Sequence, residues 1–236
     1  METEQTTWPG HDRRDPDRTQ PSWAVRRPLA DWLRAEAAAG DGDRRVLDVG
    51  CGVKPYYPFF APHGASYVGV DLNNPDADLQ GAAEALPVED GSYDVVLCNQ
   101  VLEHVEDPDA VVRELHRVAA PGGRVLASTH GVMVYHPNPD DLWRWTHTGL
   151  ERLFRRNGDW ASVTVAPGAG TAATVGMLLA TYAHLLFKQA HAPRLAGPLV
   201  AGLNLAGAAL DRRVPLLRGT APGTLAANYH VTAVKA

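Results

Sequence analysis

The most constraining feature of the sequence is a short apolar run that ends in two glycines, Val46–Gly52 (VLDVGCG). Such a run is typical of a buried strand of a parallel sheet that leads into a tight turn. Glycine in that turn lets the backbone approach a ligand closely, because a Cβ atom would collide with it. In a doubly wound sheet the turn lies at the carboxyl edge, where ligands bind. We therefore expect an α/β domain built around this strand.

Further apolar runs follow, and helical patterns separate them. Strands are expected at Ser66–Val70, Asp94–Cys98, Arg124–Ser128 and, from an alternating pattern, at Asn228–Lys235. Strands that alternate with helices indicate a parallel sheet that carries helices on both faces.

Three amphipathic segments carry helix signals. One helix is expected over Ser22–Ala39. A second begins at the N-cap residue Asp107, which a proline follows, and ends at Pro121-Gly122-Gly123, where the chain turns. A third is expected to open with a capping box at Thr148–Glu151 and to close near Gly158. The region after it is expected to be helical and apolar before the last strand.

Composition excludes several classes of protein. The formal net charge is -5, with 22 Lys and Arg against 27 Asp and Glu, so binding of nucleic acid by bulk charge is not expected. Only two cysteines occur, which argues against a disulfide framework and favours a cytoplasmic location. Residues 1–21 are polar, contain no signal peptide and are expected to form a flexible arm.

Asp71 directly follows the second expected strand. An acid at this place can accept both hydrogen bonds from a ribose diol. A dinucleotide site uses the same geometry, but its fingerprint calls for a third glycine where this chain has Pro55, which offers no N–H. A turn with a purely structural role is the other alternative. These residues alone leave the three interpretations open.

Six segments in register extend this pattern over much of the chain. They are Val46–Gly52, Tyr67–Asp71, Ala83–Pro87, Tyr93–Asn99, Val101–Val105 and Pro121–Leu126. Together they resemble the class I S-adenosylmethionine-dependent methyltransferases, in particular the small-molecule group that includes quinone-biosynthesis methyltransferases. The resemblance is strong from residue 45 to about 130 and moderate over 131–157. It implies a Rossmann-like, doubly wound and mostly parallel seven-stranded sheet with an antiparallel last strand.

The resemblance also assigns a cofactor, S-adenosyl-L-methionine, to residues at the strand ends. Asp48, Gly50 and Gly52 would border its methionine part, and Asp71 would hold the ribose hydroxyls. Residues around the adenine and the sulfonium would be Leu72, the backbone N–H of Ala83, Asn99 and Gln100. The family often has an acid before the Ala83–Pro87 run, where this chain has Ala82, so Asp78 or backbone groups would recognise the adenine amine.

The segment 130–147 follows the fourth expected strand and has no clean period, which is typical of a loop over the sheet edge. His130 and His136 are the candidate general bases, and a non-catalytic role is the alternative. Tyr135, Trp143, Arg144 and Trp145 are candidates for an acceptor pocket. Each of these also has a structural interpretation, either packing of the loop or an ion pair with Asp140 or Asp141. No metal is expected, because the spacing of the ligand-type residues is not tight.

The core is expected at 22–158 and an apolar helical insertion with the final strand at 159–236. Two segments without charged side chains, 171–187 and 195–210, fall at or below the length of a membrane span. They are expected to cover the sheet or form a homodimer face. The alternative is that they line a pocket for a lipid-like acceptor or touch a membrane surface.

These features predict methyl transfer from S-adenosylmethionine to a small acceptor, with a hydroxyl as the expected nucleophile. In-line positioning supplies much of such a rate enhancement, so an obvious catalytic triad is not required. If His130 is the base, the rate should rise from pH ~6 to ~7.5. The alternative function is a catalytically inactive cofactor-binding domain that acts as a partner or regulator.

Overall fold

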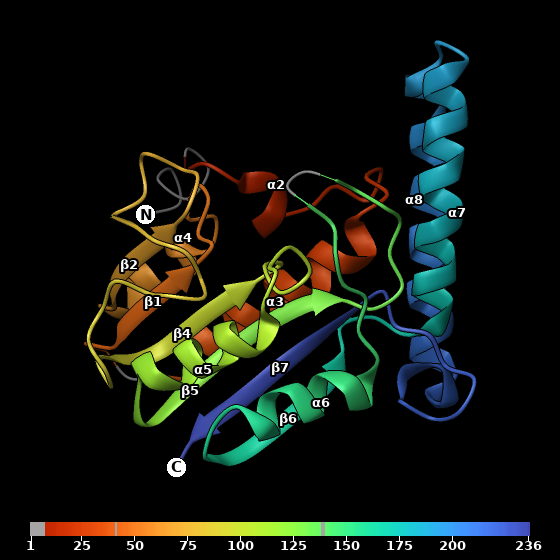
Figure 1. Cartoon of the computed structure of the whole chain (residues 1–236). Helices are drawn as coiled ribbons and strands as arrows, with labels where there is room; N and C mark the ends of the chain where they lie inside the picture. The colour runs from red at the N-terminus through yellow and green to blue at the C-terminus, as the bar shows by residue number, and fades with distance from the viewer. Residues whose placement is uncertain (1–7, 41, 138–139) are drawn as a thin grey trace.

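A seven-stranded sheet forms the centre of the computed structural model, which describes residues 8–40, 42–137 and 140–236 (Figure 1). The strand order is β3-β2-β1-β4-β5-β7-β6. Strands β1 to β5 pair in parallel, and β7 runs antiparallel to both β5 and β6. The strands are β1 (Arg45–Val49), β2 (Ser66–Asp71), β3 (Leu79–Gln80), β4 (Tyr93–Asn99), β5 (Ala119–His130), β6 (Trp160–Pro167) and β7 (Asn228–Lys235). This topology confirms the expected fold class.

Helices cover both faces of the sheet, as expected for a doubly wound fold. On one face, Leu29 and Leu33 of α3 (Trp23–Ala38) pack with Val46 of β1 and Leu97 of β4 in one core cluster. On the other face, α5 (Pro108–Val118) and α6 (His147–Arg156) bury their apolar stripes. Short helical turns are α2 (His11–Arg14), α4 (Tyr57–Phe60), η1 (Ala61–His63) and η2 (Pro215–Arg218).

The helix that begins after Asp107 is capped as the sequence predicts. The Asp107 side chain accepts from the backbone N–H of Ala110 at 3.0 Å. The N-cap of α6 is Thr146, two residues before the start of the capping box predicted at Thr148–Glu151. Its hydroxyl accepts from the Gly149 N–H at 3.1 Å. The fourth expected strand is longer than predicted: β5 starts at Ala119, and its pairing with β4 shifts register around the Pro-Gly-Gly segment.

Two regions correct the sequence analysis. The segment after α6 contains strand β6, where Val163 and Val165 are buried and Ser162, Thr164 and Ala166 are exposed. Residues 8–21, expected to be loose, include the buried Arg14 and Pro16, although most of the others are exposed. The Arg14 guanidinium is buried and donates to the carbonyl oxygens of Trp8, Pro9 and Pro55 at 2.7–2.8 Å. Residues 1–7 of the expected arm lie outside the described residues.

Helices α7 (Thr171–Gln189) and α8 (Pro193–Arg213) form a long antiparallel hairpin that projects away from the sheet (Figure 1). Its base packs on the domain through Ala173 and Met177 of α7, which contact Ala24 and Val25 of α3. The buried carboxylate of Asp211 accepts from the N–H groups of Ala172 and Ala173, at the start of α7. None of the helices in the described parts of the chain is long and apolar enough to span a membrane.

Candidate active site

The turn after β1 has the conformation that its glycines were expected to supply. Gly50 and Gly52 have φ of 67° and 49°, a left-handed region that disfavours other residues. A Cβ on Gly50 would collide with the side chain of Val101, so this glycine serves the packing of the turn. A Cβ on Gly52 would meet no heavy atom within 4 Å. Gly52 therefore borders open space at the carboxyl edge of the sheet, where the cofactor is expected.

Asp71 joins that turn to the end of β2. Its Oδ2 accepts from the Gly52 N–H at 2.9 Å, and its Oδ1 accepts from the N–H groups of Asn73 and Asn74, both at 2.9 Å. A carboxylate offers about four acceptor positions, so these three bonds orient the group and leave one position for a ligand. The neighbouring Leu72 is 63% exposed, as a residue that covers an adenine ring could be.

Asp48, the residue before the last of β1, is expected to border the methionine part of the cofactor, and this stays a prediction. It is 3% exposed and accepts from the Tyr67 hydroxyl at 2.7 Å. Burial raises the pKa of Asp48 to about 7, although the Tyr67 hydrogen bond opposes this. This hydrogen bond joins the side chains of β1 and β2. Asp78, the suggested substitute for the missing adenine acid, is engaged by Lys54 and by the Gly69 N–H.

The end of β4 provides the strongest sign of an absent ligand. Both polar atoms of the Asn99 side-chain amide are buried and have no hydrogen-bond partner, which is costly unless a bound group satisfies them. Gln100 follows at φ 58°, and its N–H and side-chain amide donate to the Ser128 carbonyl and hydroxyl. Ala83 is half-buried beside the same core. The open space at Gly52 and the unpaired amide of Asn99 fit a cofactor at this edge.

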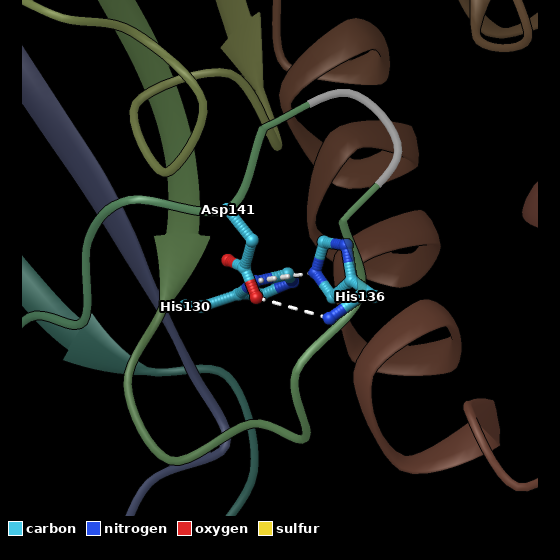
Figure 2. Close-up of side chains that lie close together, drawn as sticks. All are labelled: His130, His136 and Asp141. Atoms are coloured by element: carbon cyan, nitrogen blue, oxygen red, sulfur yellow. Dashed lines mark hydrogen bonds between the residues drawn. The ribbon is translucent and has the colours of Figure 1, made fainter.

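His130 and His136, the two candidate bases, lie against each other at the end of β5 (Figure 2). Nδ1 of His130 is 3.1 Å from Nε2 of His136, and the rings are nearly perpendicular. His130 is 4% exposed, and burial, with His136 next in importance, lowers its pKa to about 3. The expectation that His130 titrates between pH 6 and 7.5 is therefore wrong for this environment.

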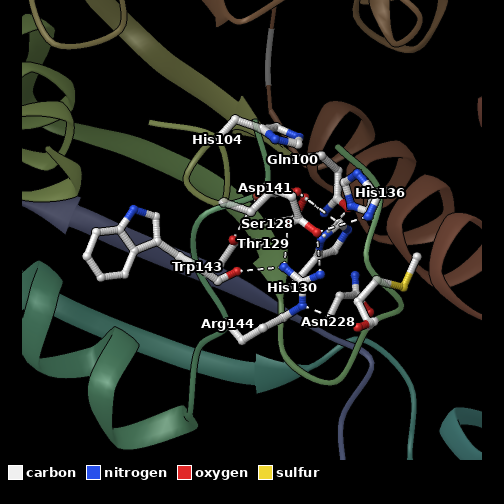
Figure 3. A network of polar contacts seen from close by, with 12 residues as sticks. Gln100, His104, Ser128, Thr129, His130, His136, Asp141, Trp143, Arg144 and Asn228 are labelled. Atoms are coloured by element: carbon white, nitrogen blue, oxygen red, sulfur yellow. Dashed lines mark hydrogen bonds and ion pairs between the residues drawn. The ribbon is translucent and has the colours of Figure 1, made fainter. Parts of the chain in front are cut away.

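Glu103 is the third member of this group, and Figure 3 shows the network around the two histidines. It is fully buried, its Oε2 accepts from the Thr129 hydroxyl at 2.8 Å, and its Oε1 lies 3.4 Å from Nε2 of His130. Burial raises the pKa of Glu103 to about 7. Its backbone carbonyl accepts from Leu142 N and Trp143 N, so the same residue also holds the loop in place.

Asp141 and Arg144 form an ion pair that ties down the loop. Both Arg144 amino groups reach the Asp141 carboxylate, at 2.5 and 2.7 Å, and the His136 N–H donates to it at 3.0 Å. Arg144 was expected either to line an acceptor pocket or to form an ion pair, and its contact with Asp141 confirms the ion pair. His130, His136 and Asp141 bring ligand-type atoms within 4.8 Å of one another. Arg144 already neutralises the Asp141 carboxylate. That no metal binds here stays a prediction.

The aromatic residues of the loop divide into packed and exposed ones. Trp143 stacks on Trp145 with centroids 5.8 Å apart, and its indole N–H donates to the Val105 carbonyl at 2.8 Å. Trp145 packs against the core, and its own N–H is buried without a partner. Tyr135 is 74% exposed. These contacts support the packing interpretation for both tryptophans and leave their role toward an acceptor a prediction.

Sequence reasoning missed Glu103 and Thr129 as parts of this site. Glu103 belongs to the segment Val101–Val105, which was used only for the family resemblance. Its place in the sequence, a few residues after a strand that ends at the ligand edge, was an available signal. Thr129 gave none, because a threonine near the end of a strand is common.

The sheet order, the glycine turn and the strand-end residues are those of an S-adenosylmethionine-dependent methyltransferase. The sequence matches the methyltransferase domain family over residues 23–164, and the chain belongs to this family. It is 37% identical over 126 residues to a ubiquinone biosynthesis O-methyltransferase of Bordetella avium, which covers 47% of this chain and 52% of that protein. The chain thus spans about half the length of the curated relative that it matches.

Solved structures agree on the fold. A SAM-dependent methyltransferase from Archaeoglobus fulgidus is similar with a TM-score of 0.56 and 15% identity, over 88% of this chain and 93% of that one. A Haemonchus contortus phosphoethanolamine N-methyltransferase 2, in complex with S-adenosyl-L-methionine, is similar with a TM-score of 0.55 and 18% identity. That match covers 95% of this chain and 58% of the other. The cofactor of this chain is S-adenosylmethionine.

Proposed function

We propose that the protein transfers the methyl group of S-adenosylmethionine to the hydroxyl of a small acceptor. The observation that carries the proposal is the contact of His130 with His136 at the end of β5, beside the strand end that holds Asn99. When bound, the cofactor supplies an electrophilic methyl group on sulfur, and sulfur keeps the electron pair of the broken bond. The name of the Bordetella relative supports an oxygen acceptor.

The chain's own residues would divide this work. Gly52 leaves room for the cofactor, Asp71 holds its ribose, and the Asn99 amide gains a partner when the site is filled. His130 is neutral over the physiological range, because its pKa lies near 3, so its Nδ1 can accept a hydrogen bond from His136, the ring of the pair that is not fully buried. A positioned base of this kind contributes roughly 10²–10⁴-fold to the rate.

The test is production of S-adenosylhomocysteine with catechol as a hydroxyl probe. His130→Ala should lower the turnover number by roughly 10²-fold or more and leave S-adenosylmethionine affinity nearly intact. His63→Ala, outside the loop, is the matched control and should behave like the wild type. Tight cofactor binding with no turnover on catechol or other hydroxyl acceptors would instead favour the non-catalytic binding domain, for which the comparisons offer no support.

We further propose that the acceptor is apolar or lipid-linked and that the α7–α8 hairpin meets a membrane surface. The hairpin exposes large apolar side chains, among them Leu179, Leu186 and Leu195, of which the last two are each 66% exposed. Residues 160–210 contain no Asp or Glu, whereas Lys188 and Arg194 lie near its tip. Exposed leucine with only positive charge is the composition that interfacial helices use on anionic lipid.

Co-sedimentation with phosphatidylglycerol vesicles tests the membrane contact, with phosphatidylcholine vesicles as the neutral reference. We expect binding to the anionic vesicles, and we expect the double substitution Leu186→Asp with Leu195→Asp to abolish it. Light scattering after gel filtration tests the other expected use of this face. A dimer of the wild type that the same substitution dissociates, without vesicle binding, would replace the membrane contact by a homodimer.

A further inference from the structure

Glu103 is the buried acid of the site, and no step assigned so far uses it. It has two carboxylate oxygens with different surroundings. Oε2 is held by the Thr129 hydroxyl at 2.8 Å, while Oε1 has no hydrogen-bond partner and lies 3.4 Å from Nε2 of His130. A buried acceptor without a partner is costly, and the His130 ring nitrogen is the donor placed to satisfy it. The carboxylate therefore aims at the inner nitrogen of this ring.

The two histidines extend this contact outward. His130 is 4% exposed, so an acceptor molecule cannot reach it without displacing the loop. Its outer nitrogen Nδ1 is 3.1 Å from Nε2 of His136, which is half-buried. The contacts thus lead from a fully buried carboxylate, through a buried ring, to the half-buried ring of His136.

We infer that Glu103 is a positioning residue that sets the tautomers of His130 and His136 and receives the proton released during methyl transfer. This inference rests on the proposed function. With ionised Glu103 as acceptor, His130 carries its proton on Nε2 and offers the lone pair of Nδ1. His136 then carries its proton on Nε2, donates it to His130, and presents an unprotonated Nδ1 toward the acceptor.

Three protons move in this relay. As the acceptor oxygen forms its bond to carbon and the carbon–sulfur bond breaks, the hydroxyl proton passes to Nδ1 of His136. A second proton passes from Nε2 of His136 to Nδ1 of His130, and a third from Nε2 of His130 to Oε1 of Glu103. The relay ends with a neutral carboxylic acid, two neutral rings of the opposite tautomer, a methyl ether and a neutral thioether.

The electrostatics of the site agree with this direction. Burial raises the pKa of Glu103 to about 7 and keeps His130 neutral, so a proton is better accommodated on the acid than on the inner ring. The charged groups that face the relay are Asp141 and Arg144, which neutralise each other, and His104 lies against His136 with centroids 5.3 Å apart. The relay needs ionised Glu103, so turnover should rise with pH through about 7.

The first experiment follows the tautomers without any acceptor, by long-range ¹H–¹⁵N spectra of the histidine rings across pH. In the wild type, the ring nitrogens of His130 should shift with a midpoint near pH 7, as Glu103 ionises. Glu103→Gln should lose this step. Glu106→Gln, an exposed acid in the same segment, is the control and should keep it. A step that persists in Glu103→Gln overturns the inference.

Thr129→Val provides a second test that does not require Glu103→Gln to fold. Thr129→Val removes the hydrogen bond that favours the ionised form of Glu103, so the midpoint should move to higher pH. An unchanged midpoint would contradict the role of Glu103. With catechol as acceptor, Glu103→Gln should lower kcat by roughly 10²-fold, flatten the pH profile and leave KM for S-adenosylmethionine unchanged. Full activity with the wild-type profile overturns the relay, whereas an inactive wild type that keeps the spectroscopic step overturns only methyl transfer.

Discussion

The cofactor side and the acceptor side of the same sheet edge are held together in different ways. On the cofactor side, the ends of β1 and β2 are fixed by backbone groups, as in the bonds of Asp71 to Gly52 and to the residues directly after it. On the acceptor side, the end of β5 is fixed by a contact between side chains that are distant in sequence, in which the Thr129 hydroxyl donates to Glu103. Backbone geometry suits a ligand shared by a whole family, whereas side-chain networks can change with the acceptor.

The largest effect is expected on the cofactor side, from Gly52→Val. A branched side chain would fill the open space at this position and strain a φ of 49°. We expect at least a ~100-fold loss of S-adenosylmethionine affinity by calorimetry. Gly122→Val is the matched control, because Gly122 has a φ of 72° and also faces open space, but lies in the bulge of β5. Equal affinity losses in both variants would mean that strain, not the cofactor, explains the result.

Asp71→Ala should have the next largest effect. It removes the expected ribose acceptor and the three backbone hydrogen bonds that hold the turn. We expect a loss of about 1.5–3 kcal/mol of binding free energy and a lower melting temperature. Asp76→Ala, an exposed acid of the same loop, should change neither quantity. Normal binding by Asp71→Ala would show that the backbone alone fixes the cofactor side.

On the acceptor side, His130 should make stability depend on pH. Its folded-state pKa, near 3, lies below the unfolded value of about 6.5, so the unfolded state binds one more proton between these values. Stability is lost as pH falls through this window, by about 1.4 kcal/mol per pH unit. Urea denaturation from pH 6.5 to 4 measures how the free energy of unfolding changes with pH. In His130→Gln this change should be smaller by about 1.4 kcal/mol per pH unit. Parallel curves for the two proteins would contradict the burial of a neutral ring.

The smallest expected effect is a difference in stability between variants of two neighbouring tryptophans, Trp143 and Trp145. Trp143→Phe loses the hydrogen bond to the Val105 carbonyl and should lower the free energy of unfolding by about 1 kcal/mol. Trp145→Phe removes a buried N–H that has no partner, so its stability should stay the same or increase. Thermal denaturation of both variants measures the difference. The reverse order would mean that a ligand or water satisfies the Trp145 indole.

Local signals predicted several elements of the fold well. The bounds of β1 and β7 and the Asp107 cap follow from patterns within a few residues. The failures have physical causes. Strand β6 was missed because two buried valines between small residues are a weak alternation that depends on pairing with β7. The order of residues 8–14 depends on Arg14 reaching the Pro55 carbonyl, a contact that no local pattern encodes.

The candidate site shows the same division. The open space at Gly52 agrees with what the motif implied, since glycine acts through its own backbone. The low pKa of His130 was not foreseen, because burial and the neighbouring His136 lower it, and neither can be inferred from spacing. Arg144 was assigned both to an acceptor pocket and to an ion pair, and its bidentate bond to Asp141 supports the second.

The position of β7 has a consequence for synthesis on the ribosome. This strand is the last in the chain, yet it pairs with β5 on one side and β6 on the other. Until its eight residues emerge, β6 has no neighbouring strand among the described residues and β5 presents an unpaired edge. Unpaired edges invite contacts between nascent chains. The sheet can therefore close only after β7 is made, and only then can His130 pair with Asn228 on that strand.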